Sequence, residues 1–126
     1  AFAAGQQEAT KPIIRKVQAK RTAAWSGQEM FNEYCVACHG KGGKGDGPAA
    51  PALKSAVPDL TAEAARHGGK FPEAKVLRAI KGDPDLIAHG SPEMPVWGAV
   101  LHGRTSQDGE ETMRLRNLVE YIKTLK

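Results

Sequence analysis

The sequence predicts an all-α fold in a single small domain. The strongest observation is an apolar stripe near the C-terminus, in which residues recur at the helical spacing i, i+3, i+4, i+7 and i+10: Leu115, Leu118, Val119, Ile122 and Leu125. The second is a capping box, because Ser26 is followed three residues later by Glu29. No segment alternates apolar and polar residues as strands do. A length of 126 residues fits one domain with one core.

The first helix is expected to begin after Ser26 and to run to about Cys35. The apolar residues at helical spacing on it are Met30, Phe31 and Tyr34. Residues 40–48 contain too many glycines for a regular element, so we expect a compact loop that passes close to the preceding helix turn. It is not a phosphate-binding loop, because Lys44 is followed by glycine rather than by Ser or Thr.

Two short helices are expected in the middle of the chain. Thr61 is predicted to cap one that ends at Arg66. Pro72 suits the first turn of the next, and Gly82 suits its end. The residues expected to face inward from this helix are Val76, Leu77 and Ile80. The C-terminal stripe then predicts a last helix from about residue 109 to residue 125.

Charge divides the chain into an N-terminal extension, residues 1–24, and a domain, residues 25–126. The extension holds five Lys and Arg side chains and one acidic residue, and this balance equals the net charge of the whole chain, +4. We expect the extension to be solvated and flexible, and contact with a membrane surface or an acidic partner is the alternative use of its charge. No apolar run of about 18 residues, the length of a membrane helix, occurs in the sequence.

The most informative motif is Cys-x-x-Cys-His, formed by residues 35–39. Two thiols at this spacing can each add to a haem vinyl group while the adjoining imidazole reaches the iron. Cys35 and Cys38 are therefore predicted to bind haem c covalently, with His39 as an axial ligand. A thioredoxin-like redox pair does not need the histidine and follows a strand that is not predicted here. Structural zinc usually draws on two ligand pairs, and the chain has only two cysteines.

The candidate for the second axial ligand is Met94. Its neighbours include Pro92 and Pro95, which favour a stiff, extended loop that can hold a thioether sulfur on the iron. Met30 and Met113 lie inside predicted helices, where methionine usually fills the core.

The other histidines are alternatives to Met94. His89 lies in the same segment and is the strongest of them. His67 and His102 stand beside glycines, as histidines at helix ends do, where the ring interacts with the helix dipole.

With these residues in place, the chain resembles the class I c-type cytochromes, in particular bacterial monohaem members with G-x-G-D-G-P-A-A after the haem motif. The resemblance covers about residues 25–126. Gly27 and Phe31 match the N-terminal helix of that family, and Leu118 and Tyr121 match the C-terminal helix that crosses it. It implies a small cytochrome c-like helical domain wrapped around one covalently bound haem.

The resemblance also implies two supporting roles near the haem. Pro48 matches the proline whose backbone carbonyl accepts a hydrogen bond from the axial histidine, here His39. Trp97 matches a tryptophan that packs beside the haem or bonds a propionate, and ordinary core packing is the alternative for this residue.

The function that follows is electron transfer rather than enzymatic catalysis. We expect a soluble carrier, exported to the periplasm with its signal peptide removed, that moves single electrons between respiratory or dehydrogenase partners. These redox partners would dock at the haem edge, near Lys41, Lys44 and Lys54, and nucleic acid is not among them. Two alternatives remain open: a haem subunit or domain of a larger oxidoreductase, and, if Met94 is labile, an open-site sensor or peroxidase.

Overall fold

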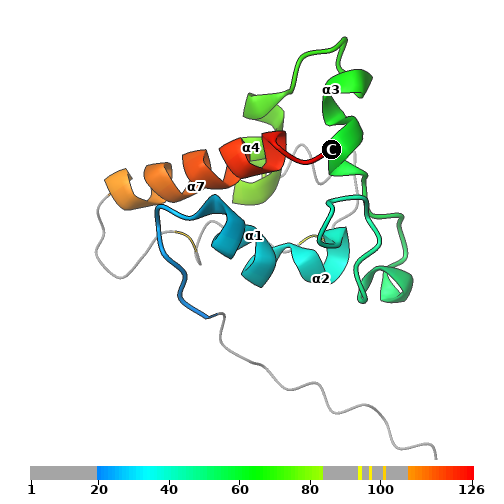
Figure 1. Cartoon of the computed structure of the whole chain (residues 1–126), viewed down its shortest axis with the longest axis horizontal. Coiled ribbons are helices and arrows are strands. Elements are labelled where there is room, and N and C mark those ends of the chain that lie inside the picture. Colours follow the sequence, from blue (N-terminus) through cyan, green and yellow to red (C-terminus); the bar gives the residue numbers. More distant parts are fainter. Residues whose placement is uncertain (1–19, 84–93, 95–96, 98–100, 102–107) are drawn as a thin grey trace, which may run out of the picture.

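The computed structural model describes residues 20–83, 94, 97, 101 and 108–126 (Figure 1). All regular elements in these ranges are helical, and no strand occurs among them, so the predicted all-α fold is confirmed. In chain order they are α1 (Gly27–Tyr34), α2 (Val36–His39), the 3-10 turns η1 (Ala50–Ala52) and η2 (Leu60–Ala62), α3 (Glu63–Arg66), α4 (Glu73–Lys81) and α7 (Asp108–Lys123). None of the described helices is long and apolar enough to cross a membrane.

Helix α1 begins where the capping box predicted. The Ser26 hydroxyl accepts a hydrogen bond from the Glu29 N–H at 3.1 Å and satisfies one of the free donors at the helix start. One face of the helix is buried, and its members are Gly27, Met30, Phe31 and Tyr34. The helix ends at Tyr34, and the Cys35 N–H still bonds back to the Phe31 carbonyl at 2.9 Å.

Helices α1 and α7 cross closely, as Figure 1 shows, and form the largest helix–helix interface among the described elements. A Cβ atom on Gly27 would overlap the Asn117 carbonyl oxygen and lie 2.8 Å from the Tyr121 Cβ. One turn further along α1, the Phe31 ring packs on the Tyr121 ring with centroids 5.4 Å apart. The absence of a side chain at Gly27 therefore sets how near the two backbones approach.

The core forms where α1, α4 and α7 meet. Its most deeply buried large side chains are Met30, Phe31, Leu101 and Leu118. The C-terminal stripe predicted from the sequence faces it, since Leu115, Leu118, Val119 and Ile122 are buried and Leu125 is partly buried. Met113 is the exception to the expected core role of the helical methionines, because 43% of it is exposed.

The middle of the chain differs from the expectation in its cap. Asp59, rather than Thr61, is the capping residue: its carboxylate accepts from the Thr61 N–H at 2.9 Å, and η2 then leads directly into α3. Asp59 caps in place of Thr61 because its side chain lies two residues before the donor N–H and can close an Asx turn. Pro72 directly precedes α4, and Gly82 ends this helix with φ 86°, a left-handed conformation that suits glycine.

Residues 20–24 pack against α1 and α7 instead of standing away from the domain. Thr22 and Ala24 are buried, and Arg114 Nη2 donates to the Thr22 carbonyl oxygen at 2.8 Å. The Asn117 amide donates to the Ala24 carbonyl oxygen at 3.0 Å. The packed part of the chain thus begins before residue 25, and the expected extension lies, for residues 1–19, outside the described residues.

The Gly27 contact yields a stability prediction. Gly27→Ala should lower the free energy of unfolding by about 1–3 kcal/mol, because the added methyl group forces two helix backbones apart. Urea denaturation measures this. Gly109→Ala is the matched control: Gly109 is exposed in α7 with nothing within 4 Å of an added Cβ, so the same change there should stabilise by about 0.5–1 kcal/mol. Equal effects at both positions would contradict a packing role for Gly27.

Candidate haem site

The Cys-x-x-Cys-His motif occupies one short helical turn at the end of α1. Cys35 lies between α1 and α2, and its carbonyl oxygen accepts from the His39 N–H at 2.9 Å. Cys35 and His39 are buried, and Cys38 is partly exposed. The two thiols and the imidazole therefore lie on one helical turn, and neither cysteine forms a disulfide.

The glycine-rich loop folds back over the end of α2. Three of its N–H groups donate to successive α2 carbonyl oxygens: Gly45 to His39 at 2.8 Å, Gly47 to Cys38 at 3.1 Å, and Ala49 to Ala37 at 2.8 Å. These bonds satisfy carbonyls that a helix end leaves without partners. A Cβ atom on Gly47 would lie 2.6 Å from the Ala37 carbonyl carbon, so the close passage depends on glycine. The expectation that the loop passes close to this helix turn is confirmed.

His39 is held as a neutral imidazole. Burial lowers its pKa, and this outweighs a backbone hydrogen bond with Pro58 and the charge of Glu63, both of which raise it. Neutral imidazole is the form that binds metal ions. The Nδ1 atom is buried and has no partner of full hydrogen-bond geometry among the described residues, although the backbone of Pro58 is near enough to influence the ring.

Cys35 is held as a neutral thiol. Burial, followed by the nearby Cys38, raises the pKa of Cys35 to about 12. Thiol–disulfide oxidoreductases instead lower the pKa of the attacking cysteine to obtain a thiolate. Among the described residues, no three His, Cys, Asp or Glu side chains gather as a metal-binding set. This environment does not favour the thioredoxin-like or zinc alternatives.

Met94 and Trp97 lie against the same core as Cys35. Both are partly buried and pack on the cluster that contains Cys35, Tyr34 and Leu101. The Trp97 ring packs on the Tyr34 ring with centroids 5.4 Å apart. The ligand role of Met94 and the haem contact of Trp97 stay predictions.

The alternative axial ligands are only partly described. His67 ends α3, and its ring nitrogens interact with the Glu63 carbonyl oxygen at 2.8 Å and with Lys75 Nζ at 3.2 Å. Both ring nitrogens are thus already engaged. His89 and His102, and the prolines Pro92 and Pro95, lie outside the described residues.

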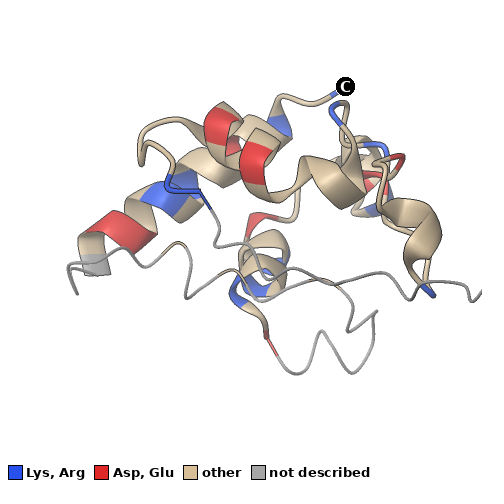
Figure 2. Ribbon diagram, turned by 90° about the horizontal axis from the view of Figure 1, so that it is seen from below, with Lys and Arg blue, Asp and Glu red and all other residues tan. Residues whose placement is uncertain are grey.

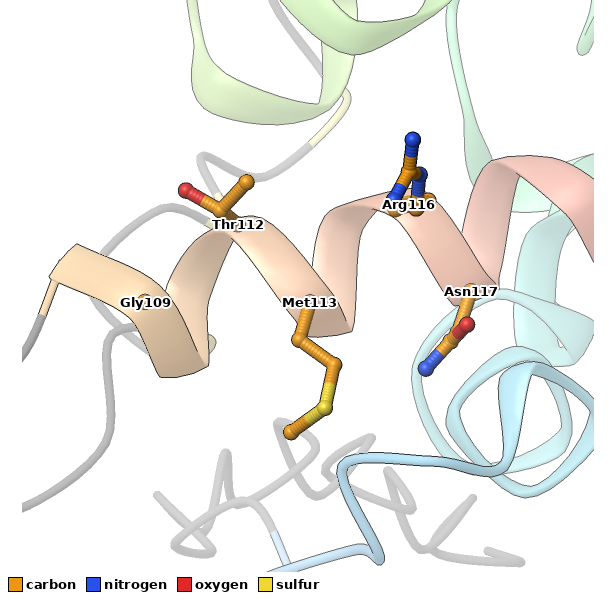
Figure 3. A pocket seen from close by; sticks show the side chains of 5 residues that line it. All are labelled: Gly109, Thr112, Met113, Arg116 and Asn117. Carbon is orange, nitrogen blue, oxygen red and sulfur yellow. The ribbon is translucent and has the colours of Figure 1, made fainter.

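Two surface hollows lie away from the motif. One follows the side of α7 and is lined by Gly109, Thr112, Met113, Arg116 and Asn117, with the Met113 side chain projecting from the helix (Figure 3). The other lies at the start of α4, near His67 and Phe71. Neither is lined by a residue of the motif, so neither belongs to the candidate haem site.

Comparison with known families identifies the chain. The family model described as cytochrome C oxidase, cbb3-type, subunit III matches residues 22–108, well over half of the sequence. The chain belongs to this family. It is a c-type cytochrome domain, and its cofactor is haem c with its iron. The match begins at residue 22, within the segment that packs on α7. No curated protein and no solved structure gave a significant match.

The residues of this cytochrome domain fit haem c. Cys35 and Cys38 are free, His39 is buried and its lowered pKa keeps it neutral, and its Nδ1 is left for a hydrogen bond that orients the ring. The donor set would be two thiols for attachment and an imidazole for iron. The residues that would hold the group are these three, with Met94 as the candidate on the other side.

Sequence reasoning did not find Pro58. It assigned the carbonyl that orients His39 to Pro48, whereas the backbone that raises the pKa of His39 is that of Pro58; both prolines are exposed. The role of Pro48 stays a prediction, with Pro58 as its rival. Both prolines follow the motif within 20 residues, and the one local feature that marks Pro58 is the Asp59 cap directly after it. Their distance from the motif along the chain does not show which of the two the loop places beside the His39 ring.

Gly45 supports the segment that carries Pro58, which gives a second prediction. Gly45 has φ 85°, and a Cβ there would overlap the Val57 carbonyl oxygen and lie 3.5 Å from that of Pro58. Gly45→Ala should cost about 2 kcal/mol or more in unfolding free energy and displace Pro58 from His39. The measurements are urea denaturation and the NMR shift of the His39 ring N–H in the haem-loaded protein.

Gly42→Ala is the control for this variant. Gly42 has no strained φ, and the nearest atom to an added Cβ is Lys44 Cγ at 3.9 Å, so both readouts should stay near wild type. An unmoved His39 ring proton in Gly45→Ala would show that Pro58 is not its partner.

Proposed function

We propose that this cytochrome domain is a soluble carrier that passes single electrons through a His39/Met94-ligated haem c. The observation that carries the proposal is the buried, neutral His39 on the same turn as two free thiols, in a chain of a c-type cytochrome family. Membership of that family supports haem-based electron transfer as the general activity. The proposal adds three specific points to this general activity: Met94 ligates the iron, Cys35 and Cys38 attach the haem, and the protein diffuses freely.

The chain's own residues serve this activity in three ways. Haem c, when bound, supplies an iron that gains and loses one electron. Cys35 and Cys38 hold it in place, His39 donates its neutral imidazole, and the thioether of Met94 favours the reduced state. A thioether and an imidazole are good ligands in both oxidation states, so few atoms need to move when the electron arrives. No substrate-binding group is required for that step.

A second candidate is a haem subunit of a larger oxidase. The matching family is described by its place in a cbb3-type oxidase, which favours this candidate. Both candidates use the same haem site and differ in whether the partner is permanent. Under both, the partners are redox proteins.

We infer that partners dock near the haem edge and that the protein acts in the periplasm. Lys41, Lys44 and Lys54 are exposed on the segments that follow the haem motif. Basic and acidic residues are interspersed over the described helices rather than separated by sign (Figure 2). Docking would then be transient and sensitive to salt. The family supports export in general terms, because haem c proteins typically act outside the cytoplasm.

An absorption spectrum tests the proposal. The ferric protein should be low-spin with the weak long-wavelength sulfur-to-iron band, and carbon monoxide should not bind the ferrous form rapidly. Met94→Ala should remove the band and lower the potential by a sizeable share of the roughly 0.8 V over which axial ligands tune haem. Met113→Ala is the matched control, since Met113 is 43% exposed on α7. A high-spin wild-type spectrum with rapid carbon monoxide binding would instead support an open-site sensor or peroxidase.

We also propose that residues 1–19 contact anionic lipid or an acidic partner. Supporting this, the exposed Trp25 (79%) and Arg21 (59% of its side chain) lie just beyond the segment, and Trp is common at membrane interfaces. Deleting residues 1–19 leaves Thr22 and Ala24 in place and should weaken binding to anionic vesicles at low salt.

The control for the deletion is substitution of Lys11, Arg15 and Lys16 by Gln, which removes charge but keeps length. Binding that both variants retain would contradict contact through this segment. If the full chain copurifies stably with an oxidase, and only the deletion of residues 1–19 abolishes this copurification, the subunit candidate is favoured.

A further inference from the structure

Tyr34 joins three parts of the molecule that are far apart in the sequence. It is the last residue of α1, directly before Cys35, and only 7% of it is exposed. Its ring packs on Trp97, with centroids 5.4 Å apart and planes at 31°. Its hydroxyl bonds to residues 20 and 22.

The hydrogen bonds at the Tyr34 hydroxyl run in one direction. Tyr34 donates to the Lys20 carbonyl oxygen at 2.7 Å. A phenol has a single proton, so the bond of 3.1 Å between Tyr34 and Thr22 must be donated by Thr22 Oγ1. Thr22 Oγ1 accepts in turn from Arg114 Nη1 at 3.2 Å. Each hydroxyl both accepts and donates, and the chain of bonds ends on a backbone carbonyl.

This chain of bonds is buried at Thr22 and Arg114, partly buried where Tyr34 bonds to Lys20, and anchored on α7. Thr22 and Arg114 are each 4% exposed. Arg114 also donates to the Thr22 carbonyl oxygen at 2.8 Å and to Glu110 Oε1 at 3.1 Å. A buried polar network in which every group has a partner rigidifies its surroundings, since breaking any bond leaves an unsatisfied group. The ring of Tyr34 is therefore a fixed surface.

Trp97 connects that surface to Met94. The Trp97 N–H donates to the Ile80 carbonyl oxygen at 3.1 Å, and the Leu101 N–H donates to the Trp97 carbonyl oxygen at 3.0 Å. These bonds hold its backbone near the end of α4, and Tyr34 holds its ring. Met94 is only three residues earlier, a reach of about 10 Å at full extension, so the positions open to its sulfur depend on Trp97.

We propose that Tyr34 is a positioning residue for Met94: its anchored ring holds Trp97, and Trp97 holds the segment whose methionine closes the second axial position. The inference rests on the proposed ligation of iron by Met94. It assigns residues 20–22 a further role, because their docking on Arg114 keeps the Tyr34 ring in place.

The test is the rate at which imidazole replaces Met94 on the ferric haem-loaded protein. Tyr34→Phe keeps the ring and removes the hydroxyl, so the rate should rise roughly 3- to 10-fold, the effect of one net hydrogen bond. Thr22→Val should act in the same direction, and Thr22→Ser, which keeps the hydroxyl, should restore the wild-type rate. Tyr121→Phe removes the chain's other phenol hydroxyl and should leave the rate unchanged.

Ile122→Val separates a purely structural role for Tyr34, because it weakens the core on α7 two turns away from Arg114 and leaves the bonds of Tyr34, Thr22 and Arg114 in place. If imidazole binding accelerates equally in Ile122→Val and Tyr34→Phe at matched loss of unfolding free energy, the proposal is overturned. An unchanged rate in Tyr34→Phe, with the sulfur-to-iron band present, overturns the positioning role alone. A wild-type protein without that band overturns Met94 ligation and this proposal with it.

Discussion

The backbone contact between α1 and α7 at Gly27 is the constraint on which the rest of the structure depends. It brings Phe31 onto Tyr121 and buries Met30 and Leu118 in one core. Because α2 follows α1 after a single residue, the same crossing also fixes where the Cys-x-x-Cys-His turn lies. A side chain at this position would separate the helices and move the candidate haem site together with α1.

The candidate haem site is built mainly from backbone. The glycine loop returns its N–H groups to the carbonyl end of α2 and carries the chain toward Pro58, beside the His39 ring. Burial then sets the chemistry, because it keeps His39 deprotonated and Cys35 protonated. A protonated Cys35 does not favour a thioredoxin-like redox pair, which needs a thiolate, and a neutral imidazole is the form that binds metal ions. Glycine is needed because passage this close leaves no space for Cβ atoms.

Much of this could be predicted from the sequence. The capping box at Ser26, the apolar stripe of the last helix and the left-handed end at Gly82 are local signals, and each corresponds to an observed feature. The predicted cap at Thr61 and the predicted burial of Met113 were wrong. Whether Asp59 or Thr61 caps depends on the exact turn, and whether a helical methionine is buried depends on what packs against that face.

By itself, the sequence determined the helical class, the start of the first helix and the haem motif, since periodicity, caps and fixed covalent spacing act over a few residues. Only the tertiary structure decided that residues 20–24 belong to the packed domain, that Pro58 approaches His39, and that Tyr34 meets Trp97. These contacts join segments separated by up to about 90 residues, as in the bonds between Thr22 and Arg114. Residue spacing along the chain does not predict such contacts, because they depend on how the helices cross and on which side chains the crossing buries.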